Sequence, residues 1–414
     1  MTGEGAGDRR SAEVAQELEP GEGDALVAWS ALAEPGDRIA QWLVGTVGAK
    51  EALQWWKESV QSNGRVALPA SVEPRDRERI ERAVERWEAR RERSEPGRLR
   101  EQASACGARV IERGAPGWPR ALADLGQQQP YVLWVRGDAD LKASFDAGVA
   151  VVGARAATAY GEHMTAEVAA GIADGRRAVI SGGAYGIDAR AHRAALAAGG
   201  RTVAVLAGGV DRLYPAGNAD LLAAIVRGGA LVSEFPPGSA PHRSRFLERN
   251  RLIATAAATV VVEAAVRSGA LSTARHALDL ARPVAAIPGP ATSPSSAGCH
   301  RLIRDQQAVL CTSARDVLEL VEPIEQVLEL DLGLNAGPPG GIEFAHAHDR
   351  KAYDAIGARG SAVEDVMKDA GLTTQEALMS LGRLEMAGMA SHAGGLWRRA
   401  APAGATPSIA IKRQ

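Results

Sequence analysis

Cysteine is scarce in this sequence. Only Cys106, Cys299 and Cys311 occur among 414 residues, and no two of them form a CxxC pair. The sequence therefore predicts neither a disulfide framework nor a zinc site, and it is typical of a reducing compartment such as the cytoplasm. The acidic, glycine-rich start lacks the apolar stretch of a signal peptide, and no run of about 18 apolar residues predicts a membrane span.

Several catalytic motifs are also missing. No lysine occurs between Lys142 and Lys351, so the phosphate-binding loop GxxxxGK[ST] has no counterpart in the centre of the chain. The dinucleotide fingerprint GxGxxG with a later acidic residue is absent, as are GxSxG and HExxH. We therefore expect no ATP hydrolysis, no bound metal or cofactor, and no enzymatic activity.

The charges of the chain are unevenly distributed. The formal net charge is −2, which argues neither for nor against a nucleic-acid partner. Between residues 150 and 321, however, eighteen arginines stand against thirteen aspartates and glutamates, a local excess of five positive charges. Codon bias explains the use of arginine in place of lysine but not where the arginines cluster. The central region is therefore the part of the chain to search for an anion site.

The sequence divides into five parts. Trp29, Leu32 and Ile39 recur at helical spacing near the start, and a glycine- and proline-rich linker occupies residues 332–341. We expect a disordered start, a SAM-like helical domain, a Rossmann-like core, a linker region and a winged-helix domain, at residues 1–23, 24–95, 100–325, 326–345 and 346–400, respectively.

In the core, short apolar runs alternate with helical patterns. This alternation predicts an α/β fold whose parallel sheet is covered by helices on both faces and binds ligands beyond the carboxyl ends of its strands. The predicted strands are Val149–Val152, Ala178–Ile180, Thr202–Leu206, Leu231–Ser233, Thr259–Val262 and Val284–Ile287. The predicted helices are Tyr160–Ala173, Asp188–Ala198, Phe246–Ala257 and Ser272–Ala281.

The C-terminal part has the pattern of a winged helix. Capping-box patterns at residues 361–364 and 373–376 predict two helix starts, with Gly371 between the helices. Residues 389–398 predict a β-hairpin wing. Arg383 is the one cation of the predicted recognition helix, and a helix that enters a DNA groove normally needs several. We therefore expect this domain to contact protein rather than DNA.

Two predicted strands of the core run into turns of small residues. Glycines allow a phosphate to approach the backbone, a helix N-terminus offers unpaired N–H groups, and an arginine adds a bidentate contact. Either turn alone is also compatible with simple helix packing, but two in one sheet favour a binding site. The candidate residues are Gly153, Arg155, Ser181, Gly182, Gly183, Gly186 and Asp188.

The segment 241–251, PHRSRFLERNR, contains four arginines, one aromatic and one amide. Arginines neutralise backbone phosphates, and Phe246 can stack on an unpaired base. The alternatives are a solvated helix start with salt bridges through Glu248, and a core position for Phe246 beside Ile253. Gly269, in the turn after a later strand, is expected to close the same pocket.

Potential catalytic groups are isolated in the sequence. Asp188 and His192 lie four residues apart on a predicted helix, but Asp188 is better explained as the N-cap of that helix. Glu234 and Glu263 follow strands without a second carboxylate or a metal-binding cluster nearby in sequence.

Together these motifs resemble the DNA-processing protein A (DprA/Smf) family. They occur in the family's order as VVGAR (151–155), ISGGAYGIDARAH (180–192), RNRLIA (249–254), VVEAAVRSGALSTA (261–274), IPG (287–289) and GCHRLIRD (298–305). The resemblance implies that the chain binds single-stranded DNA, forms a homodimer through its Rossmann core, and loads the RecA recombinase during natural transformation.

The resemblance also implies site residues and departures from the family pattern. By position, the implied site residues are Arg155, Ser181, Gly182, Gly186, Asp188, Arg243, Phe246, Asn250 and Arg251. Ala154 stands where the family usually has Ser or Thr, and Ala216 stands where a basic residue often follows the Tyr-Pro pair. These departures predict either weaker contacts with DNA or a contact supplied by another arginine, such as Arg212.

Two other functions are alternatives. A nucleotide-processing enzyme of the phosphoribohydrolase type would share the fold, but its PGGxGTxxE segment is absent. A transcription factor that reads DNA through the winged helix is disfavoured by the charge of that domain. For the dimer surface we predict Leu302 and Ile303, although such an apolar pair at the end of an α/β domain is more often part of the core.

Overall fold

The computed structural model describes residues 21–62, 77–321, 347–357, 360–386 and 388–399. The chain forms two compact units, Met1–Val327 and Leu328–Gln414. Most of the predicted disordered start, and the whole of the predicted linker at 326–345, lie outside the described residues.

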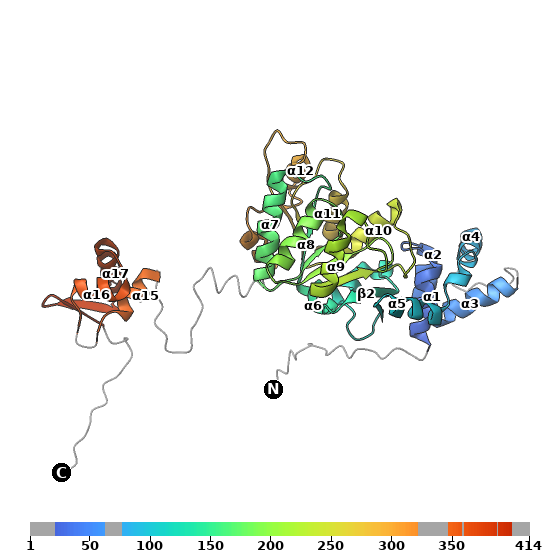
Figure 1. Cartoon of the computed structure of the whole chain (residues 1–414), viewed down its shortest axis with the longest axis horizontal. Helices are drawn as coiled ribbons and strands as arrows, with labels where there is room; N and C mark the ends of the chain where they lie inside the picture. Colours follow the sequence, from blue (N-terminus) through green and yellow to red (C-terminus); the bar gives the residue numbers. More distant parts are fainter. Residues whose placement is uncertain (1–20, 63–76, 322–346, 358–359, 387, 400–414) are drawn as a thin grey trace, which may run out of the picture. The chain divides into compact units, whose positions relative to one another are not determined.

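The first unit is built on a nine-stranded sheet with the order β1-β2-β6-β5-β4-β3-β7-β8-β9 (Figure 1). Strands from β6 to β9 in this order run parallel, whereas β1 and β2 are antiparallel at one edge. The α/β prediction is therefore confirmed. The strands are β1 (Arg109–Glu112), β2 (Val132–Gly137), β3 (Val149–Val152), β4 (Val179–Ser181), β5 (Thr202–Val205), β6 (Gly229–Ser233), β7 (Ala258–Val261), β8 (Val284–Ala286) and β9 (Val309–Leu310).

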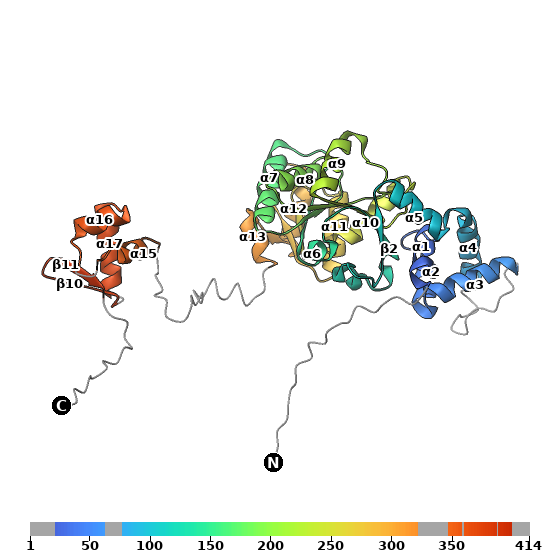
Figure 2. The same cartoon turned by 60° about the horizontal axis from the view of Figure 1, so that its bottom comes forward.

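The helices of the core lie on both faces of the sheet (Figures 1 and 2). The core of one face is built with α6 (Leu141–Ala147), α10 (Arg243–Ile253), α11 (Gly269–Asp279) and α12 (Ala297–Arg304). The core of the opposite face is built with α7 (Ala159–Asp174), α8 (Ile187–Ala197), α9 (Ala219–Gly228) and α13 (Ala314–Glu319). The helix predicted at 246–257 thus begins three residues earlier, at Arg243, and ends at Ile253.

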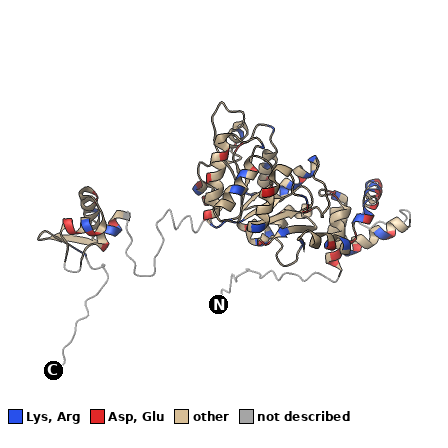
Figure 3. Ribbon diagram, viewed as in Figure 1, with Lys and Arg blue, Asp and Glu red and all other residues tan. Residues whose placement is uncertain are grey.

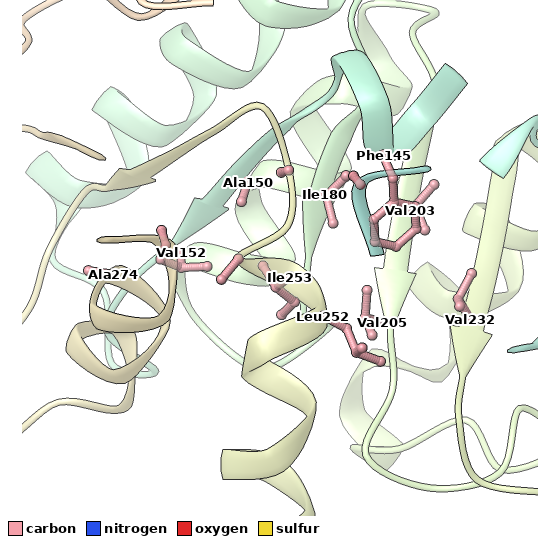
Figure 4. Packing of buried hydrophobic residues seen from close by; sticks show 14 of the residues in the cluster. Phe145, Ala150, Val152, Ile180, Val203, Val205, Val232, Leu252, Ile253 and Ala274 are labelled. Carbon is pink, nitrogen blue, oxygen red and sulfur yellow. The ribbon is translucent and has the colours of Figure 1, made fainter. Parts of the chain in front are cut away.

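Aliphatic side chains dominate the core, as the low aromatic content requires. Figure 4 shows Leu252 and Ile253, at the end of α10, pointing towards the strand residues Val152 and Val205. All four side chains are almost completely buried. The C-terminal end of α10 is therefore fixed to the sheet, while its first turn lies beyond the strand ends.

The N-terminal helices form a layer against β2 and α9. Trp29 of α1 contacts Trp87 of α4 edge-on, with 5.0 Å between ring centroids, and lies 6.3 Å from Tyr131, just before β2. The carboxylate of Asp37 caps α2 and accepts a hydrogen bond of 3.0 Å from the indole of Trp87. The layer consists of α1 (Glu22–Leu32), α2 (Arg38–Val47), α3 (Ala49–Gln61), α4 (Arg77–Glu88) and α5 (Pro96–Ala105).

The second unit has three helices and a hairpin, α15 (Ala347–Asp354), α16 (Val363–Ala370), α17 (Thr374–Met386), β10 (Ala390–Ala393) and β11 (Leu396–Arg399), among its described residues. The capping box predicted at 373–376 is confirmed, because Thr373 and Glu376 bond each other's backbone amides. The one predicted at 361–364 is wrong. Ser361 instead accepts from the amide of Gly357, and Ala362 is the N-cap of α16.

Candidate nucleic-acid interface

A pocket of about 300 Å³ lies beyond the carboxyl ends of β3, β4 and β7. The chain places β4, β5 and β6 on one side of β3 and then returns to place β7, β8 and β9 on the other. Such a reversal leaves a crevice where open α/β sheets bind their ligands. The pocket wall is made by the turn after β3, the start of α8, one face of α10 and the start of α11.

The structure divides the predicted site residues into two groups. Six of them line the pocket: Gly153, Arg155, Asp188, Phe246, Asn250 and Gly269. The other six lie outside its lining: Ser181, Gly182, Gly183, Gly186, Arg243 and Arg251.

The turns after β3 and β4 interlock. Gly186 has φ +72°, and a Cβ built on it would lie 2.3 Å from the carbonyl oxygen of Ala154. The amide of Ile187 donates to the same oxygen at 3.1 Å. A Cβ on Gly153 would in turn lie 2.5 Å from the side chain of Ile187. These glycines allow the two loops to touch, so Gly186 acts by positioning the pocket wall.

Asp188 holds the loop after β4. The N-cap of α8 is Gly186, so the expectation that Asp188 would cap this helix is wrong. Its carboxylate instead accepts from the amides of Gly182, at 3.1 Å, and Ala184, at 3.4 Å. Burial raises the pKa of Asp188, and the nearby Arg249 opposes that shift. The residue therefore shapes the pocket wall from within the protein.

Arg249 is a pocket residue that the sequence did not single out. It is 3% exposed, and its Nη1 donates to the carbonyl of Gly182 at 2.8 Å and to that of Val205. Its Nε has no hydrogen-bond partner among the described residues. Burial lowers the pKa of Arg249 to about 10, which still leaves the side chain charged at neutral pH. The signal was its spacing, because Arg249 follows Phe246 by three residues on one helical face.

Phe246 stands at the mouth of the pocket. Its side chain is half-buried, and the guanidinium of Arg155 lies 5.1 Å from its ring centroid. The ring of Tyr214, which is 51% exposed, lies 6.0 Å away on a different loop. Phe246 is thus not a fully buried core residue, and its ring has a cation and a second aromatic as neighbours. A cation beside a ring at this distance is an attractive contact.

The far wall of the pocket is the N-terminus of α11. Ser268 caps the helix through a hydrogen bond from the amide of Ala270 to its hydroxyl at 3.3 Å. Asn250 donates from its side-chain amide to the carbonyl of Gly269 at 3.4 Å. A Cβ built on Gly269 would have no atom within 4 Å, so this position is open to the pocket.

Three predicted residues at the end of β4 and in the loop that follows have structural roles. Ser181 is fully buried and donates to the carbonyl of Val151 at 2.6 Å. A Cβ on Gly182 would lie 2.4 Å from the guanidinium of Arg249, and Gly183 has φ +68°. The loop conformation therefore requires small residues here.

Arg251 points away from the pocket. It is 2% exposed, and its guanidinium makes two hydrogen bonds of 2.7 Å to the carboxylate of Glu234. A third goes to the carbonyl of Gln128 at 3.1 Å. This guanidinium is committed to holding α10 against β6, so no surface is left for a ligand.

Arg243 and Arg245 occupy the first turn of α10. Arg243 is exposed, and its side chain forms no hydrogen bond or ion pair with any residue that the structure describes. Arg245 is bonded to the carboxylate of Glu34 in the loop after α1, at 2.6 Å and 3.2 Å. Of these two, Arg243 is the cation available to solvent.

The isolated acidic and histidine side chains of the core have structural partners. Glu263 is buried and accepts from the amide and hydroxyl of Thr158. His192 is fully buried, 2.7 Å from the hydroxyl of Thr202, and burial lowers its pKa to about 3. Among the described residues, no group of three His, Cys, Asp or Glu is placed to hold a metal ion. No described helix is long and apolar enough to cross a membrane.

Comparison with known proteins identifies a family that this chain matches. A family model described as DNA recombination-mediator protein A matches residues 109–322. A protein of Mycobacterium tuberculosis, described as a putative DNA processing protein DprA, is 46% identical over 304 residues, which cover 70% of this chain and 77% of that protein. The protein Smf of Escherichia coli is 36% identical over 285 residues, covering 66% and 71%.

A solved structure also resembles this chain. The crystal structure of DNA processing protein A from Streptococcus pneumoniae superposes with a TM-score of 0.56 and 29% sequence identity. The match covers 72% of this chain and 98% of that chain. It therefore extends beyond the region of the family model.

Proposed function

Because this chain belongs to the DNA recombination-mediator protein A family, we propose that its core pocket binds single-stranded DNA. Phe246 carries the proposal, since its half-buried ring stands at a pocket mouth beside Arg155. Stacking on an aromatic ring is the usual way in which a protein holds an unpaired base without reading its sequence.

The charges around the pocket suit a phosphate backbone. Arg155 is exposed at the rim, Arg249 is buried in the wall, and Arg243 lies on the first turn of α10. Arg249 makes its hydrogen bonds to backbone carbonyls and forms no salt bridge within the described part of the chain, although the buried carboxylate of Asp188 is near enough to interact with its charge. Asp188, the acidic residue of the lining, has its carboxylate turned to the loop amides. We infer that the pocket attracts an anion.

The pocket favours a single strand over a duplex. Its volume of about 300 Å³ suits a base or a sugar-phosphate unit rather than a double helix. In a duplex the bases are already stacked and cannot reach Phe246 without an unstacking cost of a few kcal/mol. We therefore expect tight binding to single strands without marked sequence preference.

The experiment is fluorescence anisotropy with matched single- and double-stranded oligonucleotides over a salt series. We expect the single strand to bind more tightly and Arg155→Ala to weaken it. Arg315→Ala is the matched control, because Arg315 lies on α13 with an 85% exposed side chain. Equal or tighter binding to duplex, or an equal effect of both substitutions, would contradict the proposal.

The family consists of recombination mediators rather than enzymes, and we propose that this chain has no catalytic activity of its own. Phosphoribohydrolase-like cleavage of a nucleotide is the alternative, and Glu263 is the acidic residue that follows β7. Its carboxylate is bonded to Thr158 and to Ser295, which suits a structural role. ATP turnover, or release of a base from a nucleotide, that disappears in Glu263→Gln would overturn this proposal.

We further propose that the DNA-bound protein loads a RecA recombinase during the processing of incoming strands, in the cytoplasm. This proposal is supported by the membership of the family. The test is recombinase-dependent strand exchange on DNA already coated with single-strand-binding protein. We expect wild type to relieve the block and Phe246→Ala to fail, whereas relief by both would separate recombinase loading from this pocket.

For the homodimer, we propose a surface next to the predicted one. Leu302 is 4% exposed and belongs to the core, in line with the alternative given for this pair, and Ile303 is partly buried against the same core. The exposed apolar residues of this region are Val309 and Leu310, at 51% and 50%, on the edge strand β9. An open apolar edge strand is a ready surface for pairing with a second chain.

Light scattering tests this surface. We expect Leu310→Glu to halve the mass of the wild-type particle, while Arg304→Glu, on the neighbouring α12, is the matched exposed control. A wild-type monomer, or a Leu310→Glu dimer, would contradict the proposal.

A further inference from the structure

A second groove lies beside the first turn of α10. It has a volume of about 810 Å³ and separates the N-terminal helices from the loops that follow β5 and β6. One wall comes from the end of α1 and from α5, and the other includes Asp211 and His242. Phe235, which is 2% exposed, contributes to its lining.

The first turn of α10 separates this groove from the core pocket. His242 and Arg245 line the groove, whereas Phe246 lines the pocket. The two concavities thus adjoin each other at the first turn of α10. Arg243, exposed on the same turn, lies between them in sequence.

The groove carries more positive than negative charge. Its arginines are Arg90, Arg93, Arg98 and Arg245, and its carboxylates are Glu34 and Asp211. Both carboxylates are already engaged. Glu34 accepts from Arg90 at 2.9 Å and from Arg245 at 2.6 Å, and Asp211 accepts from the amide of Gly238 at 2.9 Å.

Arg93 and Arg98 are the cations left over. Both are exposed, and their side chains form no hydrogen bond or ion pair with any residue in the described part of the chain. They come from the segment that links α4 to α5 and from α5 itself, so they are fixed to the N-terminal layer. In Figure 3 the blue ribbon segments mark lysine and arginine positions, and several of them lie on the N-terminal helices.

We propose that this groove is a second section of the single-strand site, in which Arg93 and Arg98 bind phosphates of a strand that leaves the core pocket across the first turn of α10. The inference rests on the proposed function and deepens it. A continuous polyanion is the occupant that uses both concavities, because unpaired cations border each of them and one exposed turn lies between. The N-terminal layer then lengthens the site.

This arrangement makes binding depend on the length of the strand. A short oligonucleotide fills the core pocket alone and does not reach Arg93 or Arg98. A longer oligonucleotide also contacts both arginines and releases counterions there. Each phosphate contact on a single strand adds about 0.7 to the slope of log affinity against log salt.

The first experiment compares Arg93→Ala/Arg98→Ala with wild type on oligothymidines from about 4 to about 30 nucleotides. For the double variant we expect wild-type affinity on the shortest oligothymidine that binds. On the longest oligothymidine we expect a salt slope lower than that of wild type by about 1.4. The matched control is Arg82→Ala/Arg91→Ala, which removes two arginine charges of the same layer outside the groove. Equal slopes for the two double variants on long strands would overturn the proposal.

The second experiment uses Cys106, which lines the groove and is half-buried, whereas Cys299 and Cys311 are fully buried. Alkylation of the native protein therefore reports on the groove. Burial raises the pKa of Cys106, so the reaction is run at alkaline pH. We expect long oligothymidine to slow the modification and the shortest binding oligothymidine to leave it unchanged. Equal rates with and without a saturating long strand would contradict the second section.

Failure of the proposed function and failure of the second section give different results. If wild type binds no single strand of any length, the proposed function fails and this inference falls with it. If wild type binds with the same affinity at every length, and Phe246→Ala abolishes that binding, the core pocket stands and the second section is wrong.

Discussion

Helix α10 of the core and helix α17 of the C-terminal unit both place arginine near exposed apolar side chains, but the arginines have different partners. In α10, Arg243 is exposed without a partner among the described residues, and Arg249 bonds backbone carbonyls in a pocket wall. In α17, Arg383 makes hydrogen bonds of 2.6 to 3.1 Å to the buried carboxylate of Asp349. The charge of these two arginines of α10 is therefore available to a ligand, whereas the charge of Arg383 in α17 is neutralised by Asp349.

The outer surface of α17 instead carries several exposed apolar side chains beside polar ones. Leu378, Met379 and Met386 are 49%, 55% and 84% exposed. Exposed methionines and leucines on a helix suit contact with protein, whereas a helix that enters a DNA groove needs cations on that face. The partner of each arginine, rather than the number of arginines, therefore separates a candidate anion site from a structural helix.

The largest expected effect comes from a paired arginine of α10. Arg251→Ala leaves the carboxylate of Glu234 buried without its partner, and breaking a buried ion pair costs about 3–5 kcal/mol of stability. Urea denaturation followed by tryptophan fluorescence measures this loss. Arg243→Ala is the control on the same helix and should change stability by less than about 0.5 kcal/mol. Similar losses in both variants would break the distinction between paired and unpaired arginines.

Acid should destabilise the core through His192. Burial lowers its pKa to about 3, whereas a histidine in an unfolded chain titrates near about 6.5. Below pH 6.5 the unfolded state therefore binds a proton that the folded state excludes, and stability falls with pH.

The size of this pH effect follows from linkage. Between pH 7 and pH 5 the loss from His192 is about 2 kcal/mol. Denaturation curves at both pH values for wild type and His192→Asn check it, since the variant should lose less stability on acidification. A variant with the same pH dependence as wild type would show that His192 is protonated in the folded core.

Removing the ring of Phe246 should weaken DNA binding by about 1–3 kcal/mol and leave the salt slope nearly unchanged. Stacking is a contact between rings and releases no counterion. Because Phe246 is half-buried, the melting temperature of the Phe246→Ala protein should stay close to that of wild type. Phe246→Leu should recover only part of the affinity. A Phe246→Ala protein with a much lower melting temperature than wild type would show that Phe246 is a core residue.

The sequence predicted the central strands well, because they are apolar on both sides. β3 was predicted with its observed bounds, and the strand preceding Glu263 was placed one residue too late. β1, β2 and β9 were missed. β1 and β9 are four- and two-residue strands at the sheet edges without a continuous apolar pattern, whereas β2 does contain a buried apolar run and was overlooked. An edge strand is defined by its pairing with a neighbouring strand, and sequence periodicity gives no information about that neighbour.

The arginines of α10 could not be sorted from the sequence for a similar reason. Arg249 and Arg251 stand in one short motif, yet one lines the pocket and the other is paired with Glu234. Glu234 follows β6, and its approach to α10 depends on the order of strands in the sheet. The alternative of a solvated helix start with salt bridges through Glu248 was wrong, because Arg251 is buried and the ion pairs of Arg251 and Arg245 are made with Glu234 and Glu34.

Arg155→Ala should have a smaller effect on affinity than loss of the ring. Its guanidinium is exposed and lies over Phe246, so the variant loses one phosphate contact and one cation–π contact. The salt slope should fall by about 0.7. Arg155→Lys keeps the charge and should retain the slope while losing part of the affinity. Unchanged slopes in both Arg155→Ala and Arg243→Ala would remove the proposed phosphate site.

The smallest expected effect belongs to α17 and decides whether the comparison holds. Leu378→Gln/Met386→Gln changes the exposed apolar surface of this helix and leaves the pair of Arg383 with Asp349 in place. Substituting Arg383 itself would confuse binding with folding, because Asp349 would be left buried without its arginine. We expect the double variant to bind single strands and duplexes within about 0.5 kcal/mol of wild type, measured by anisotropy beside Arg155→Ala as the positive control. A clear loss of duplex binding would make α17 a DNA-contacting helix after all, and the partner of an arginine would no longer separate the two regions.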